Sequence, residues 1–105
     1  MTTDCVEFCK ALADDTRQRI LVMLLDGEKC VGDIVDAFDM TQPTISHHLS
    51  VLRRLRLVTS RKKGKLVFYA LNHENVVQCC GQLMAKFEAE EACEATYAVF
   101  LGADL

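Results

Sequence analysis

The sequence has no apolar run long enough to cross a membrane, no internal repeat and no low-complexity linker. A membrane-spanning helix needs about 20 consecutive apolar residues. Residues 1–5 also lack the basic and apolar segments of an export signal. We therefore expect a cytoplasmic protein that has no membrane partner. The 105 residues suffice for one domain with a modest core, spanning residues 1–105, but not for two.

Acidic residues are missing from positions 41–72, although the whole chain carries a net charge of −3. The cations of this segment are Arg53, Arg54, Arg56, Arg61, Lys62, Lys63 and Lys65. Residues 1–40 hold nine acids against four bases, and residues 73–105 hold six against one. A cationic block inside an acidic chain is typical of a phosphate-binding surface. A charged face that is merely solvated is the alternative, and the complete exclusion of acids argues against it.

The features that a small enzyme needs are also missing. There is no glycine-rich phosphate loop, and there are no closely spaced cysteine pairs of the zinc-ribbon kind. A catalytic cysteine needs a base and an orienting group. The histidines instead lie in the basic segment and at the start of the last helical segment. We expect no enzymatic activity and no structural zinc.

Apolar spacing predicts three helices before residue 40. The first covers residues 6–12, with Asp4 as its N-cap. Asp14 begins the second, which ends at residues 26–27, where glycine suits a left-handed cap. The second helix is apolar on most sides, so we expect it to be central to the core through Ile20, Leu21, Met23, Leu24 and Leu25. The third is short, begins at residue 31 and ends near Asp39.

A fourth helix is predicted after a turn of about three residues. Thr41 is its N-cap candidate, and Pro43, the only proline, is tolerated in a first turn. Its buried stripe consists of Ile45, Leu49, Leu52 and Leu55. Its other face carries short polar side chains near the start of the helix. Two helices joined in this way predict a helix-turn-helix over about residues 31–56.

The periodicity changes from helical to alternating after Leu57. Residues 58–61 and 66–71 flank the basic segment Lys62-Lys63-Gly64-Lys65. A glycine in a short loop between β-branched and aromatic runs predicts a β-hairpin. Because its tip is densely basic, we interpret the hairpin, over about residues 57–71, as a wing that lies along a phosphate backbone.

Helical spacing returns at residue 74 and continues to about residue 101. One apolar stripe consists of Val76, Cys80, Leu83, Met84 and Phe87, and a second consists of Cys93, Tyr97, Phe100 and Leu101. Two stripes exceed what one small core needs. We therefore expect residues 74–101 to contribute to a homodimer interface.

Several motifs, in this order, resemble the ArsR/SmtB family of transcriptional repressors. Residues 11–21 (ALADDTRQRIL) resemble the family's opening segment, with Asp15 where proline is common. Residues 30–34 (CVGDI) resemble its CVGDL segment, residues 41–49 (TQPTISHHL) its recognition helix, and the Gly64 hairpin its wing. The resemblance covers about residues 8–72. It implies a mainly α-helical winged helix-turn-helix with a two-stranded hairpin wing and a C-terminal dimerisation helix.

The resemblance further implies a homodimer that occupies operator DNA and leaves it when an inducer binds. It places the N-terminal helix beside the last helix at the dimer interface. Within such a dimer, lysine and arginine bind phosphates, whereas bases are read in the major groove by polar side chains of the recognition helix. We predict that double-stranded operator DNA is bound by Gln42, Thr44, Ser46, His47, Arg53, Arg61, Lys62, Lys63 and Lys65. For His47 the alternative is an ordinary surface position, and His48 falls nearer the buried boundary.

Six cysteines in a reducing compartment indicate free thiols rather than disulfides. Any one of them alone could equally be a small packing residue. Cys5 and Cys9 are four residues apart, so a helix places them on one face. Cys79 and Cys80 are adjacent, and side-chain rotation brings neighbouring thiolates to one ion. Both pairs fall on helices that the resemblance places together, and we predict a metal site from Cys5, Cys9, Cys79, Cys80 and Cys93.

The resemblance also separates this chain from other sensor sites of the family. Of the clustered cysteines on the third helix only Cys30 is present, because Gly32 stands where arsenic and cadmium/lead sensors often have cysteine. The carboxylate and histidine pattern of zinc and nickel sensors is broken at Ala85, Lys86 and Ala89. Cys30 is therefore expected to be structural.

Thiolates without histidine or carboxylate favour a soft ion. We predict an inducer among As(III) and Sb(III), with Cd(II) and Pb(II) as weaker candidates, rather than Zn(II) or Ni(II). No constitutive cofactor is expected. Two alternatives stay open at this point: a thiol-based sensor of oxidants or sulfur species with the same fold, and a protein without cysteine-based sensing.

Overall fold

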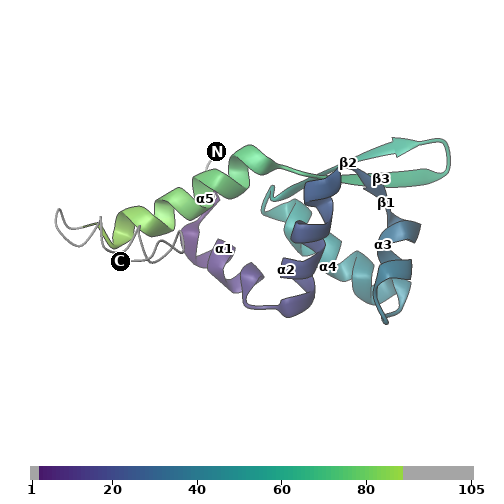
Figure 1. The fold of residues 1–105 in the computed structure, drawn as a ribbon, viewed down its shortest axis with the longest axis horizontal. Coiled ribbons are helices and arrows are strands. Elements are labelled where there is room, and N and C mark those ends of the chain that lie inside the picture. The colour runs from purple at the N-terminus through teal and green to yellow at the C-terminus, as the bar shows by residue number, and fades with distance from the viewer. Residues whose placement is uncertain (1–2, 89–105) are drawn as a thin grey trace.

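The structure is a computed structural model that describes residues 3–88 (Figure 1). Its elements are α1 (Cys5–Leu12), α2 (Asp15–Met23), the 3₁₀ turn η1 (Leu24–Asp26), β1 (Lys29–Cys30), α3 (Val31–Ala37), α4 (Gln42–Arg54), β2 (Val58–Lys63), β3 (Leu66–Leu71) and α5 (His73–Lys86). The helix-turn-helix α3–α4 is followed by the hairpin β2–β3, so the predicted winged helix-turn-helix is confirmed. None of the helices in this part of the chain has both the length and the apolar character that crossing a membrane requires.

Polar side chains fix where three of the helices begin. Asp14 accepts a hydrogen bond from the backbone N of Arg17 (3.0 Å) and caps α2. Thr41 caps α4 by accepting from the backbone N of Thr44 (3.4 Å), with Pro43 in the first turn. Such caps satisfy backbone donors that have no partner inside the helix. The predicted starts at Asp14 and Thr41 are confirmed, whereas Asp4 precedes α1 without a side-chain cap bond.

The core lies between α1, α2, α3 and α4, and α5 closes one side of it. Its fully buried side chains are Phe8, Ile20, Ile34, Ile45, Leu49, Leu52, Leu57, Val58 and Cys79. The predicted stripe of α4 is buried at its first three positions, and Leu55 is half-buried. Truncating one such Leu or Ile to Ala typically costs about 2–5 kcal/mol, so this stripe orients α4 strongly.

The second helix differs from the prediction that it is apolar on most sides and central. Ile20 and Leu21 are buried, but Val22 is 64% exposed. The helix ends at Met23, and Leu24 and Leu25 fall in the 3₁₀ turn η1. Successive side chains in a 3₁₀ turn point about 120° apart, so Leu24 is buried while Leu25 is 62% exposed. The segment therefore has one buried face.

The wing belongs to a three-stranded antiparallel sheet with the order β1-β3-β2. Lys63 pairs with Leu66, so the turn is Gly64-Lys65, two residues tighter than predicted, and Gly64 has φ 62°. Positive φ is easy for glycine because it has no Cβ. The short strand β1 pairs with β3 at Lys29↔Tyr69 and Cys30↔Phe68. This third strand, which the sequence analysis did not predict, attaches the start of α3 to the wing.

Figure 1 shows α5 and the wing at opposite ends of the molecule, with α4 between them. The helix α1 contacts α5. The helix α5 is capped at its start by Asn72, whose side chain accepts a hydrogen bond from the backbone N of Asn75. Its most buried residue is Cys79, which does not belong to the predicted stripe of α5. The stripe residues of this helix are half-buried in one chain, apart from Phe87, which is 63% exposed.

Candidate nucleic-acid interface and thiol cluster

The outward face of α4 carries the polar side chains predicted to bind DNA. All five of these residues are exposed: Gln42, Thr44, Ser46, His47 and Arg53. His48 faces the protein instead, with a side chain that is 12% exposed and an Nδ1 atom 4.0 Å from Asp14 Oδ1. The structure therefore separates the two histidines, which places only His47 on the outward face.

A hollow of about 350 Å³ lies between the start of α4, the start of α3 and the wing. It is lined by Cys30, Val31, Gly32, Gln42, Ser46, Lys65, Leu66, Val67 and Tyr69. Of the predicted DNA contacts it brings together Gln42, Ser46 and Lys65, from α4 and the wing turn. We call it the wing-side hollow.

The cations of the wing fall into two groups. Lys62, Lys63 and Lys65 are exposed, and no carboxylate of residues 3–88 forms an ion pair with them. Arg61 instead donates from Nε and Nη2 to the two carboxylate oxygens of Glu28, both at 2.7 Å. These hydrogen bonds hold the pKa of Glu28 below its ordinary value. Bidentate pairs of this kind fix geometry, so Arg61 fastens the wing to the segment that precedes β1.

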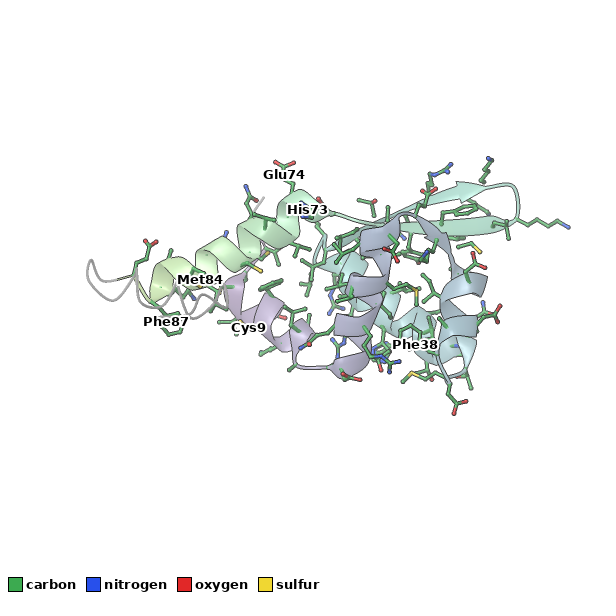
Figure 2. All side chains as sticks on the ribbon, in the orientation of Figure 1. Cys9, Phe38, His73, Glu74, Met84 and Phe87 are labelled. Carbon is green, nitrogen blue, oxygen red and sulfur yellow. The ribbon has the colours of Figure 1, made fainter. Side chains whose placement is uncertain are left out.

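Four of the predicted thiols gather where α1 meets α5. Cys5 and Cys79 are buried, Cys80 is half-buried, and Cys9 is exposed on α1, where Figure 2 labels it. A hydrogen bond links Cys5 to Cys9, Cys79 lies within electrostatic reach of Cys5, and Cys80 lies within reach of Cys9. The two pairs thus form one group, which we call the thiol cluster. Cys93 lies outside the described residues, and Cys30 is in β1 at the opposite end of the fold.

The pKa values of Cys9, Cys79 and Cys80 are raised above that of an ordinary thiol. Burial raises the pKa of Cys79, with Cys80 and Cys5 acting in the same direction and a hydrogen bond with Thr3 opposing. Burial and the nearby Cys9 raise the pKa of Cys80. Desolvation raises the pKa of Cys9, and the nearby Cys5 thiol raises it further. An ion must therefore displace protons to bind here.

The fit of the cluster to a metal ion is chemical rather than geometric. All four donors are sulfur, the ligand that soft ions prefer. Within residues 3–88, however, no three side chains of His, Cys, Asp or Glu are positioned to hold an ion. A three-coordinate site would need these side chains to move or a further ligand to join them.

The C-terminal end of α4 is held by side chains from outside the helix-turn-helix. Arg56 has φ 61°, unusual for a residue other than glycine, and the backbone N of Leu57 donates to Leu52 O (2.9 Å). The Thr3 hydroxyl donates to Leu55 O (2.7 Å). Asn75 Nδ2 lies within hydrogen-bond distance of Leu55 O (3.1 Å) and Arg56 O (3.0 Å). Together these bonds satisfy carbonyls that the helix end leaves open.

This network lies directly beside the thiol cluster. Asn75 Nδ2 is 3.1 Å from Thr3 Oγ1, and Asn72 Nδ2 donates to Arg56 O (2.9 Å). Thr3 precedes Cys5 by two residues, and Asn75 precedes Cys79 by one helical turn. Thr3, Asn72 and Asn75 were not predicted from the sequence. The capping residue Asn72 was the one available signal, because Asn favours N-caps.

Apolar side chains remain uncovered on α1 and α5. Val6, Val77 and Phe87 each have more than half of their surface exposed. Figure 2 shows Phe87 and Met84 at the end of α5 farthest from the wing. An apolar surface of this kind on a small domain marks a contact with another molecule more often than a solvated face.

The chain matches known proteins along most of the part described above. The sequence profile described as "Bacterial regulatory protein, arsR family" matches residues 14–60. The cadmium resistance transcriptional regulatory protein CadC homolog of Staphylococcus aureus is 45% identical over 76 residues, covering 71% of this chain and 63% of that protein. The transcriptional repressor SdpR of Bacillus subtilis (strain 168) is 40% identical over 63 residues, covering 60% and 70% respectively.

Two further similarities concern an arsenical regulator and a solved structure. The arsenical resistance operon repressor of Staphylococcus xylosus is 46% identical over 65 residues, covering 62% of each chain. The structure of HlyU from Vibrio cholerae N16961 has a TM-score of 0.64 at 40% identity, covering 70% of this chain and 82% of that one. The chain thus spans less than two thirds of the cadmium and arsenical regulators that it matches.

Proposed function

The chain belongs to the arsR family of bacterial regulatory proteins, and from this premise we propose that it is a transcriptional repressor whose homodimer binds double-stranded operator DNA. The observation that carries this proposal is the outward face of α4, which is exposed, polar and free of acids, beside a wing with three unpaired lysines. A helix of this kind fits the major groove, where hydrogen-bonding side chains distinguish base pairs.

The roles within this surface follow from where each side chain lies. Gln42, Ser46 and His47 are exposed near the start of α4, the end that recognition helices present to bases. Lys62, Lys63 and Lys65 supply phosphate contacts, which set affinity for any sequence. Thr44 and Arg53 complete the α4 contacts. Arg61 has its guanidinium engaged by Glu28, so we assign it mainly to positioning the wing.

The homodimer is proposed to form through α1 and α5. Val6, Val77 and Phe87 are the exposed apolar residues that a second copy would cover. A dimer built there leaves the outward face of α4 and the wing free, because Figure 1 places α5 and the wing at opposite ends. Two-fold symmetry would then present two recognition helices to one operator.

We further propose that a thiophilic ion binds the thiol cluster and releases the operator. As(III) and Sb(III) are the preferred inducers, ahead of Cd(II) and Pb(II), because the cluster offers only sulfur. Names of relatives include both cadmium resistance and arsenical resistance. The ligands come from Cys5, Cys9, Cys79, Cys80 and Cys93. If the ion and the DNA favour different dimer geometries, binding of the ion lowers the affinity for DNA. Binding of DNA lowers the affinity for the ion by the same coupling free energy.

The contact between the cluster and α4 supports this coupling. Thr3 and Asn75 bind the carbonyls at the end of α4 and lie next to Cys5 and Cys79 in the chain. The directions of the thiol pKa shifts argue against direct oxidation of these thiols, while an ion would have to displace their protons. Redox-sensing cysteines are exposed and have lowered pKa values, whereas the pKa values of Cys9, Cys79 and Cys80 are raised.

The test is to titrate the reduced protein on its operator with As(III), Sb(III), Cd(II), Zn(II) and hydrogen peroxide, and to record which releases the DNA. Cys9→Ser and Cys80→Ser are the informative variants, because neither side chain is fully buried. We expect both to bind operator normally and to lose the response to As(III), whereas the control Cys30→Ser responds. Release by peroxide alone would favour the redox alternative. Loss of response in Cys30→Ser alone would place the site at α3.

A further inference from the structure

A second hollow lies beside α4, on the side that faces α1. Its volume is about 350 Å³, and it is lined by Glu7, Lys10, Ala11, Arg17, His47, Val51, Arg54 and Leu55. Ala11 and Val51 are buried, whereas Lys10 and Arg54 are exposed. We call it the α1-side hollow. Its arginine and lysine residues are not among the DNA contacts predicted from the sequence.

The cations of the α1-side hollow are only weakly neutralised. Lys10 Nζ is 3.8 Å from Glu7 Oε1, and Arg17 Nη2 is 4.0 Å from Asp14 Oδ2. Both distances are too long for a hydrogen bond. No carboxylate within residues 3–88 pairs with Arg54. With three cations and one carboxylate in its lining, the hollow keeps a positive charge that an anion can share.

Arg17 has a buried hydrogen-bond donor without an acceptor among residues 3–88. Its side chain is 19% exposed, and its Nε atom is buried without a hydrogen-bond partner in the described part of the chain. A buried donor without an acceptor is unfavourable, more so on a charged group. Because Arg17 also lines the hollow, a phosphate there would lie beside its guanidinium.

The two hollows lie on opposite sides of the outward face of α4. Gln42 and Ser46 line the wing-side hollow, whereas His47 and Arg54 line the α1-side hollow. A helix in the major groove, which is about 12 Å wide, has a sugar–phosphate backbone on each side of it. Two hollows with basic rims that flank one helix therefore match the two backbones that flank one groove.

We propose that Lys10, Arg17 and Arg54 form a seat for a DNA backbone phosphate on the α1 side of the major groove, opposite the backbone that the wing lysines meet. The ligand is a phosphodiester of double-stranded DNA, so the contact is independent of sequence. The inference rests on the proposed DNA-binding function and extends the interface to α1 and α2, outside the helix-turn-helix.

The double variant Lys10→Gln/Arg54→Gln tests the seat, because both side chains are exposed and their loss leaves the core intact. The matched control Arg19→Gln/Lys86→Gln removes the same charge from exposed sites outside the hollow. The probes are a duplex that the full-length parent protein selects from a random-sequence pool and a scrambled duplex of equal length. Affinities are measured by fluorescence anisotropy in metal-free buffer from about 50 to 300 mM salt, the range over which counterion release is resolved.

We expect the slope of log K against log salt to fall by about 0.9 in the double variant, since the contact with one phosphate is lost. Both duplexes should weaken by the same factor, roughly five- to tenfold per lost contact near 0.1 M salt. The control should keep the parent slope. A double variant that behaves like the control, or that weakens only on the selected duplex, would overturn the seat.

Arg17→Gln is a second variant, expected to lower the slope by about 0.9, with its melting temperature measured alongside. If it fails to fold, the double variant still decides the question. A parent protein that selects no duplex would instead contradict the DNA-binding function, so the two failures are distinguishable.

Discussion

Removing the Asn75 side chain tests how firmly the last helix holds the recognition helix. Its amide group lies 3.0–3.1 Å from three oxygens, those of Thr3, Leu55 and Arg56. An amide carries two hydrogens, so Asn75→Ala removes about two hydrogen bonds. Each contributes about 1 kcal/mol net. Leu55 O keeps the Thr3 hydroxyl, and Arg56 O keeps Asn72, so neither carbonyl is left without a partner.

The expected loss is therefore about 1–2 kcal/mol in the free energy of unfolding. For a domain of this size each kcal/mol lowers the melting temperature by about 4–8 °C. Thermal unfolding followed by circular dichroism measures the shift. One protein concentration is used throughout, because the melting temperature of the proposed dimer would depend on concentration. Operator affinity of the metal-free protein should fall as well, because the end of α4 loses part of its anchorage.

Gln78→Ala is the matched control, since Gln78 is an exposed residue of the same helix. Exposed substitutions of this kind stay within about 0.5 kcal/mol. When Asn75→Ala is combined with the isosteric Thr3→Val, the two changes in the free energy of unfolding should not add, because the two side chains are in contact. If Asn75→Ala and Gln78→Ala have the same melting temperature and bind operator equally well, the hydrogen bonds of Thr3 and Asn75 do not hold α4.

Three further outcomes are expected. Glu28→Gln should free Arg61 and steepen the salt dependence of DNA binding by about 0.9, measured by anisotropy; an unchanged slope would mean that the arginine cannot reach a phosphate. Phe87→Glu should place a charge in the proposed dimer contact and shift sedimentation toward monomer, and sedimentation equal to that of the parent would contradict an interface at Phe87. The cap hydrogen bond from Arg17 N, with smaller electrostatic contributions, lowers the pKa of Asp14. The stabilisation that this carboxylate contributes is therefore complete above the ordinary aspartate pKa of about 4, and it is lost as the pH falls through the lowered pKa. Urea unfolding between about pH 5 and 2 should therefore show a steeper loss of unfolding free energy in the parent than in Asp14→Asn. Parallel plots of unfolding free energy against pH would exclude a stabilising role for the Asp14 carboxylate.

Local patterns in the sequence were sufficient for the helices and the wing. The caps at Asp14 and Thr41 and the stripe of α4 depend on residues three or four apart, so their signals lie within one short segment. The same holds for the glycine turn of the hairpin. Recognising α4 and the wing in turn located the polar and basic residues of the candidate DNA-binding face.

What the sequence did not reveal depends on contacts between distant segments. The strand β1 has two residues, too few to show any alternation, and it exists because β3 pairs with it. The Glu28–Arg61 pair joins residues 33 positions apart, and Asn75 meets Thr3 across 72. Periodicity carries no information about such pairings. The exposure of Leu25 was missed for a different reason, since a 3₁₀ turn replaced the last turn of the expected second helix.

The pairing of β1 with β3 also has a consequence for the spacing of the two operator half-sites that a dimer would bind. Together with the Glu28–Arg61 pair, it ties the start of α3 to the wing, and α4 packs against both α3 and β2. We expect these elements to move as one unit. A rearrangement at α1 and α5 would therefore change the separation of two such units rather than the shape of either. Recognition helices of dimeric repressors engage half-sites about one helical turn, 10–10.5 base pairs, apart. Inserting or deleting single base pairs between half-sites should accordingly distinguish the induced protein from the free protein by the spacing that each prefers.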